Sequence, residues 1–227
     1  MNTFKIILFD GHPIIKDGDN VILIDTGAPS TIHSTEQLIF CSDSYNCSSN
    51  YMGLTINKLS ELLGTKITTL LGTDILENYN LKLDYKNCIA QFDKNEIVLE
   101  GNERELTSFM GIPILKLNVD NQDHNFFLDT GAKLSYLASS YTANYESVGK
   151  QEDFYPGVGK FQTECFDIQT SLGNTSFNVR YGNLPTLLQR TLMMGGTKGV
   201  IGSDFFSHFK VVIDFKNKRL KYAKHSE

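Results

Sequence analysis

The tripeptide Asp-Thr-Gly occurs twice in this chain of 227 residues, at positions 25–27 and 129–131. Each copy ends an apolar run, and each is followed by an alanine, Ala28 or Ala132. Ordinary residue usage gives one such tripeptide only about 0.05 times by chance in a chain of this length. The repeat therefore constrains the fold strongly, because it requires two similar segments that each end in an aspartate.

A second motif also repeats, with a spacing of its own. Residues 71–76 read LGTDIL and residues 201–206 read IGSDFF, and the similarity continues into the next apolar segment at the same offset. The second copy thus has 26 more residues than the first between its Asp-Thr-Gly motif and its late glycine (Gly72 in the first copy, Gly202 in the second). The pattern indicates an internal duplication.

The length suits two lobes of about 100 residues each. We place them at 1–101 and 102–227, separated at a polar stretch. The net charge of -5 argues against a nucleic-acid groove or an anionic membrane surface. No apolar stretch approaches the roughly 18 residues of a membrane span, and the first ten residues contain too short an apolar run for a signal peptide. These features predict a cytoplasmic protein.

Cysteine and histidine give no metal or cofactor signal. The four cysteines form no Cys-x-x-Cys pair, and the five histidines are scattered without ligand spacing. Cys41 and Cys47 could close a small loop in an oxidising compartment, but free thiols are favoured in a cytoplasmic protein. We expect no metal and no cofactor.

Strand signals dominate the secondary structure. Segments rich in β-branched and aromatic residues are bounded by Gly, Asn or Asp, and they lie at 4–9, 21–24, 81–85, 112–119, 125–128, 161–170, 176–181 and 211–215. Helices are few and short, and we expect them at 56–63, 74–78, 184–194 and 204–208. The first should end at Gly64, and those at 74 and 204 should be capped by the preceding Thr73 and Ser203. The fold class is therefore all-β with a few short helices.

The repeated pattern of an apolar run, Asp-Thr-Gly-Ala, a later apolar-apolar-Gly and a short helix resembles the aspartic protease superfamily, which includes the pepsin-like and retropepsin-like enzymes. The resemblance spans nearly the whole chain. It implies a two-lobed β-barrel fold with an active-site cleft between the lobes. Retroviral members assemble this cleft from two chains, whereas both halves lie on one chain here, so we expect a monomer.

Asp25 and Asp129 are the predicted catalytic pair. Two carboxyl groups about 3 Å apart cannot both ionise, so they share one proton and titrate as a unit. The ionised group takes a proton from a bound water, and the protonated group polarises the scissile carbonyl. The predicted activity is hydrolysis of peptide bonds as an aspartic endopeptidase, without a metal or a covalent intermediate.

The residues around the pair have predicted supporting roles. Gly27 and Gly131 allow a sharp turn, and their amides can donate to the carboxylates. The resemblance implies that Thr26 and Thr130 each bond to the opposite loop. Gly72 and Gly202 let a second strand pass beside each loop. Ala28 and Ala132 stand where many pepsin-like enzymes have a hydroxyl donor that lowers the carboxylate pKa, so the sequence predicts an optimum in the mildly acidic range.

The additional residues of the second copy predict a single flap over the cleft. Tyr155, Gly157, Val158, Gly159 and Phe161 resemble the glycine-rich flap tip of retropepsins, with Tyr155 and Phe161 facing the substrate. A flap of this kind excludes water and donates backbone hydrogen bonds to an extended peptide. An ordinary hairpin turn is the alternative interpretation of these residues.

The expected partner is an extended peptide or protein substrate, and pepstatin-like compounds are expected inhibitors. Neither a nucleic acid nor a membrane is expected as a partner. Two alternatives stay open: a weakly active or inactive peptide-binding module of the same fold, and a protease that acts only after a partner or a cleavage orders the flap.

Overall fold

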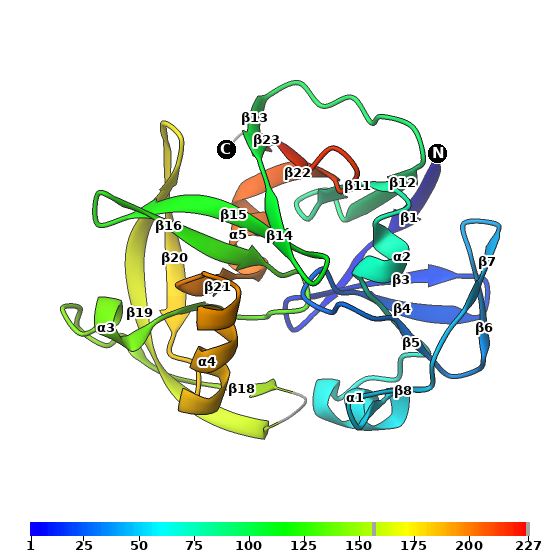
Figure 1. The fold of residues 1–227 in the computed structure, drawn as a ribbon, viewed down its shortest axis with the longest axis horizontal. Coiled ribbons are helices and arrows are strands. Elements are labelled where there is room, and N and C mark those ends of the chain that lie inside the picture. The colour runs from blue at the N-terminus through cyan, green and yellow to red at the C-terminus, as the bar shows by residue number, and fades with distance from the viewer. Residues whose placement is uncertain (156–157, 226–227) are drawn as a thin grey trace.

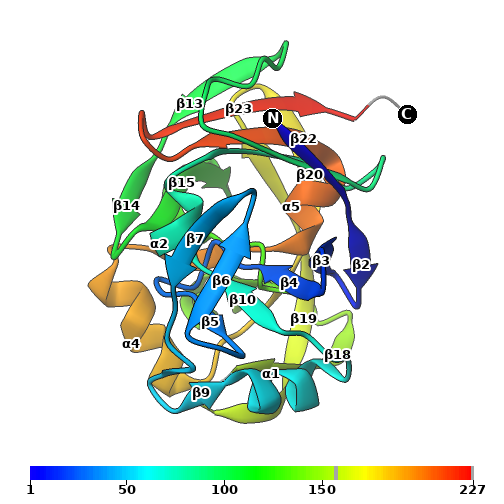
Figure 2. The same cartoon turned by 90° about the vertical axis from the view of Figure 1, so that its right-hand side faces the viewer.

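The computed structural model describes residues 1–155 and 158–225. Within them the chain forms three large sheets, of six, five and eight strands, and two small two-stranded sheets. Short helices lie at the edges of these sheets (Figures 1 and 2). This mostly-β architecture is the fold class that the sequence predicts. No helix among the described residues is both long enough and apolar enough to cross a membrane.

The elements follow the duplication. The first half contains β1 (Asn2–Lys5), β2 (Ile7–Phe9), β3 (His12–Asp17), β4 (Asn20–Ile24), β5 (Ile32–His33), β6 (Gln37–Phe40), β7 (Asp43–Asn46), β8 (Asn50–Tyr51), β9 (Leu54–Thr55), α1 (Ile56–Leu63), β10 (Thr69–Leu71), α2 (Thr73–Leu76), β11 (Asn80–Asp84) and β12 (Ile89–Asp93). The second half contains β13 (Asn102–Glu105), β14 (Thr107–Phe109), β15 (Ile112–Val119), β16 (Gln122–Leu128), β17 (Ser135–Leu137), α3 (Ser139–Thr142), β18 (Gly149–Tyr155), β19 (Gly159–Leu172), β20 (Thr175–Gly182), α4 (Thr186–Met194), β21 (Gly199–Ile201), α5 (Ser203–His208), β22 (Phe209–Asp214) and β23 (Arg219–Lys224).

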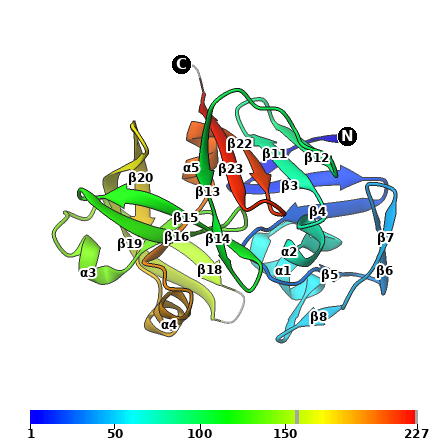
Figure 3. The ribbon, with the colours of Figure 1, turned by 45° about the horizontal axis from the view of Figure 1, so that its top comes forward.

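The six-stranded sheet joins the two halves. Its strand order is β1-β12-β11-β22-β23-β13, so each half supplies three strands (Figure 3). The central pair, β11 and β22, is antiparallel and sets Lys82 opposite Val212. These two residues occupy the same position in the two copies of the repeat, so an approximate two-fold axis passes between them.

Each half also has a sheet of its own, of order β2-β3-β4-β10-β5 in the first and β14-β15-β16-β21-β17-β20-β19-β18 in the second. In both, the strand that precedes Asp-Thr-Gly pairs in parallel with the strand that precedes the late glycine. Ile24 lies opposite Leu71 on β4 and β10, and Leu128 lies opposite Ile201 on β16 and β21. The carboxyl ends of parallel strands meet at one edge of a sheet. This pairing therefore brings each aspartate loop next to its glycine.

The structure refines several expected elements. The predicted strand at 4–9 is divided into β1 and β2 by Ile6, which is 1% exposed and whose amide donates to the Cys88 carbonyl at 2.8 Å. Helix α1 has the predicted bounds, and it ends at Gly64 with a left-handed φ of 75°. The four cysteines carry free thiols in the structure.

The predicted caps of the other two short helices are wrong. Gly72 and Gly202 occupy the cap positions of α2 and α5, and neither helix has a side-chain cap bond. Thr73 and Ser203 are instead the first helical residues. The reason is tertiary, because the amides of Thr73 and Ser203 donate to Ala28 and Ala132 in the neighbouring aspartate loops, at 2.8 and 3.0 Å.

Candidate active site

The two Asp-Thr-Gly loops face each other between the halves of the molecule. The Gly27 amide donates to Asp25 Oδ1 at 2.9 Å, and the Gly131 amide donates to Asp129 Oδ1 at 2.8 Å. Each glycine lies directly against the carboxyl group of the opposite loop. A Cβ atom on Gly27 would collide with the Asp129 carboxyl group, and one on Gly131 would collide with that of Asp25. Only glycine permits this approach.

The two loops are held together by crossed hydrogen bonds, in which each threonine side chain bonds to the backbone of the opposite loop. The Thr26 hydroxyl donates to the Leu128 carbonyl at 2.7 Å and accepts the Thr130 amide at 3.0 Å. The Thr130 hydroxyl donates to the Ile24 carbonyl at 2.7 Å and accepts the Thr26 amide at 3.0 Å. Both side chains are fully buried. The four bonds fix the separation of the two aspartates, because each loop is tied to the backbone of the other.

The late glycines, Gly72 and Gly202, pack closely against the backbone of the aspartate loops. A Cβ atom on Gly72 would lie 2.7–2.9 Å from backbone atoms of Ala28 and Ser30, and one on Gly202 would lie 2.5 Å from the Ala132 carbonyl oxygen. Cβ atoms do not approach backbone this closely, so a side chain at either position would displace the aspartate loop.

Two further hydroxyl groups complete this support, and the sequence analysis missed them. The Gly72 amide donates to Thr31 Oγ1 at 2.9 Å, and the Gly202 amide donates to Ser135 Oγ at 3.0 Å. Thr31 and Ser135 each lie six residues after their aspartate. That constant spacing from the repeated motif is the signal that could have found them.

Burial raises the pKa of both central carboxyl groups. It raises the pKa of Asp25 well above its ordinary value, and the neighbouring Asp129 charge adds to this effect. Burial also raises the pKa of Asp129, to about 6, although the amides of Gly131 and Ala132 favour its ionised form. A hydrogen bond between the two groups raises the pKa of Asp25 and lowers that of Asp129. The two carboxyl groups therefore hold one proton between them and titrate as a coupled pair.

The predicted flap residues fall in the β18–β19 hairpin, which we call the flap hairpin. Tyr155 ends β18 opposite Gly159, and the Val158 amide donates to the Tyr155 carbonyl at 2.9 Å. Gly157 lies outside the described residues. Burial and the charges of Asp129 and Asp25 raise the pKa of Tyr155. Phe161 packs against Tyr136 in the apolar cluster of the second half, with ring centroids 6.3 Å apart.

The flap hairpin reaches across to the first half through Phe154. This side chain packs against the apolar cluster that contains Ile14, Leu23 and helix α1. It also stacks on His12 of β3, with ring centroids 5.8 Å apart and an interplanar angle of 23°. His12 is 2% exposed, and its Nδ1–H donates to the Phe9 carbonyl at 3.2 Å. No local sequence pattern predicts this contact, because it joins residues from different lobes.

Phe154→Ala is expected to loosen the flap hairpin. The substitution removes apolar contact worth about 1–2 kcal/mol, which corresponds to roughly tenfold in an equilibrium constant. If the hairpin closes over a bound peptide, the Kd of that peptide should rise by up to about tenfold. A peptide-binding assay and the rate of limited proteolysis of the flap hairpin measure the two effects. Unchanged Kd and unchanged proteolysis would contradict the docking role of Phe154.

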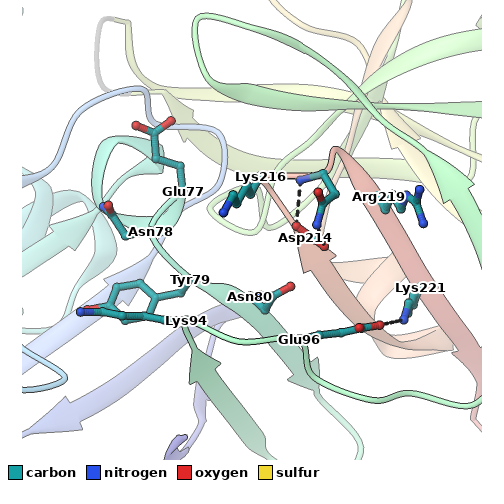
Figure 4. Close-up of a pocket in the computed structure, with 11 residues that line it drawn as sticks. Glu77, Asn78, Tyr79, Asn80, Lys94, Glu96, Asp214, Lys216, Arg219 and Lys221 are labelled. Carbon is teal, nitrogen blue, oxygen red and sulfur yellow. Dashed lines mark hydrogen bonds and ion pairs between the residues drawn. The ribbon is translucent and has the colours of Figure 1, made fainter.

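A separate hollow of about 260 Å³ lies at the end of the six-stranded sheet, away from the aspartates. Figure 4 shows its lining of charged and amide side chains, among them Asn80, Asp214 and Lys216. Several of its charges already have partners, since Lys221 pairs with Glu96 and Lys94 pairs with Asp43 outside the hollow. The hollow contains no residue of the aspartate loops and none of the flap hairpin, so it adds nothing to the site.

Among solved structures, the chain is similar to the crystal structure of the aspartic proteinase from Irpex lacteus. The TM-score is 0.50 and the sequence identity is 13%, over 99% of this chain and 97% of that chain. No protein-family model matches the sequence, and no curated protein matches it. The structural likeness shows the predicted two-lobed aspartic proteinase fold. The activity has to be argued from the site itself.

Proposed function

We propose that the protein is an aspartic endopeptidase that acts through Asp25 and Asp129. The observation that carries the proposal is the pair of buried carboxyl groups, each packed against the glycine of the opposite loop and held by the crossed bonds of Thr26 and Thr130. A buried pair of ionisable carboxyl groups is costly to keep. Such pairs occur where one proton must be shared for catalysis.

One carboxyl group of the pair acts as the base and the other as the acid, and we assign the base role to Asp129. Asp129 takes a proton from the attacking water while Asp25 transfers its proton to the oxygen of the scissile carbonyl, so the hydroxide adds to the carbonyl carbon and a neutral gem-diol forms. Asp129 then gives its proton to the leaving nitrogen, one gem-diol hydroxyl returns a proton to Asp25, and the C–N bond breaks to release a carboxylic acid and an amine. Glycine amides on both sides hold the carboxyl groups in place during these transfers.

The proposed substrate is an extended peptide segment of roughly six to eight residues, bound in strand conformation. Main-chain pairing with the flap hairpin would supply affinity, and alternate side chains would enter pockets of the two lobes. Apolar packing around Phe154 supports a preference for large apolar residues at the cleaved bond. Both aspartate loops belong to one chain, so a monomer contains the whole site.

Digestion of a mixed peptide library with and without pepstatin tests this proposal against a peptide-binding module. An endopeptidase yields new peptide termini, and excess pepstatin suppresses them. A binding module retains peptides and releases them intact when pepstatin is added. Retention without any cleavage between pH 3 and pH 8 would contradict the proposed activity and favour the binding module.

The dependence of kcat/KM on pH follows from the two carboxyl groups. Asp129 must be ionised, and its pKa is raised to about 6, so activity should fall as the pH drops through about 6. Asp25 must stay protonated for activity. Because its pKa is raised, kcat/KM should begin to decrease only at a correspondingly higher pH. A profile recorded from pH 3 to pH 9 checks this expectation. A maximum near pH 2–3 would contradict it.

A further inference from the structure

A third acidic side chain, Asp153, is buried at the root of the flap hairpin. It lies on β18 and is only 7% exposed. The Tyr136 hydroxyl donates to its Oδ2, and the Phe154 amide donates to its Oδ1 at 2.8 Å. Both donors are uncharged, so hydrogen bonds hold this carboxylate without neutralising it.

The groups that face Asp153 supply no counter-charge. Tyr136 on β17 and Cys165 on β19 interact with it, and burial raises the pKa of both, so both stay neutral. His12 on β3 also faces it, but burial lowers the pKa of His12 and keeps the imidazole neutral near pH 7. Lys133 pairs with Asp10 at 2.7 Å instead. Within residues 1–155 and 158–225, no ion pair involves Asp153.

Asp153 is linked to the aspartate pair through one strand. Tyr136 lies on β17, opposite Val200 of β21, and β21 leads directly to Gly202 behind the Asp129 loop. Burial raises the pKa of Asp129 most, and the charge of Asp153 adds to this increase. The bond to Tyr136 also ties the flap hairpin to the strand that follows this loop.

We propose that Asp153 is a positioning residue for the aspartate pair: through Tyr136 it anchors the flap hairpin to the strand that follows the Asp129 loop, and it holds a buried negative charge without an ion-pair partner at the root of that hairpin. The role in catalysis rests on the proposed endopeptidase function, whereas the electrostatic effect does not.

The test is a pH titration of the aspartate carboxyl carbons by NMR, on the full chain labelled with ¹³C-aspartate. The variants are Asp153→Asn and, as a matched control, Glu152→Gln. Glu152 is the preceding residue on β18, but its side chain is 57% exposed and pairs with Lys160 at 3.1 Å. Signals of the pair are assigned with Asp25→Asn and Asp129→Asn.

We expect Asp153→Asn to shift the first ionisation of the pair to lower pH by roughly half a unit to one unit, as expected when a nearby like charge is removed. Glu152→Gln should leave it unchanged, and the acidic limb of kcat/KM should move with the titration. If Asp153→Asn does not fold, Tyr136→Phe with Asp153→Ala removes the donor and the charge together, a change that such sites tolerate better.

The outcomes separate the two proposals. A shift in Asp153→Asn without any peptide cleavage by the wild type would support the role of Asp153 and count against the endopeptidase. Cleavage by the wild type with the same first ionisation in Asp153→Asn and Glu152→Gln would overturn the role of Asp153 and leave the endopeptidase standing.

Discussion

Replacement of Asp25 by asparagine is expected to reduce kcat/KM for peptide cleavage by about 10³-fold or more, because the shared proton and one partner of the acid–base pair are lost. The same substitution should stabilise the fold. The pKa of Asp25 is raised in the folded protein. At a pH above the ordinary pKa of aspartate, ionisation of this residue therefore stabilises the unfolded chain more than the folded chain. Asparagine removes that penalty.

This stability change has a characteristic pH dependence. The gain in the free energy of unfolding should be present at pH 7 and disappear at about pH 3, where the unfolded chain also keeps most of its aspartates protonated. Urea denaturation of wild type and Asp25→Asn at the two pH values measures it. Loss of activity together with loss of stability at pH 7 would mean that the substitution damages the fold, and it would count against a strained catalytic pair.

Thr26→Val is expected to lower the free energy of unfolding by roughly 2–6 kcal/mol. Valine matches threonine in shape but cannot donate to the Leu128 carbonyl or accept the Thr130 amide. Both backbone groups would be left buried without a partner, at about 1–3 kcal/mol each. Because the two bonds run between the loops, activity should fall as well.

Thr26→Ser is the matched control, since it keeps the hydroxyl and loses only a methyl group. Chemical denaturation of both variants at one pH separates the hydrogen bonds from packing. We expect the serine variant to stay close to the wild type and the valine variant to unfold at a much lower denaturant concentration. Equal stability of the two variants would show that the crossed bonds do not hold the loops together.

The centre of the site could be predicted because a repeated sequence pattern specifies its geometry. Two copies of Asp-Thr-Gly and two late glycines specify two parallel strand pairs, and parallel pairing brings each loop to its glycine. The crossed bonds of Thr26 and Thr130 are present because the loops meet about the approximate two-fold axis. Helix α1 was predictable from local signals alone, its apolar spacing and Gly64.

The surroundings of the site could not be predicted because they depend on contacts that the repeat does not encode. Asp153 and Phe154 sit in the additional segment of the second copy, which has no counterpart for comparison. Tyr136, the partner of Asp153, lies 17 residues earlier on another strand of the same half, and His12, the partner of Phe154, lies in the other half. The caps at Thr73 and Ser203 failed for a similar reason, since bonds to the aspartate loops decide where those helices begin.

One repeated signal was overlooked. Residues 9–14 read FDGHPI and residues 109–114 read FMGIPI. Both segments form a tight hairpin turn in which Gly11 and Gly111 have left-handed φ values of 85° and 82°. Each turn lies against the opposite half of the molecule, with Gly11 next to Ser203 and Gly111 next to Thr73. A search for a third offset would have predicted this interlocking of the lobes.

The most direct test of the account is digestion of a mixed peptide library near pH 6 by wild type and Asp129→Asn, prepared side by side and compared by mass spectrometry. The account predicts new termini next to large apolar residues with the wild type, their loss in the presence of pepstatin, and none above background with the variant. Equal cleavage by both proteins, or cleavage that pepstatin does not affect, would contradict the assignment of hydrolysis to the Asp25–Asp129 pair.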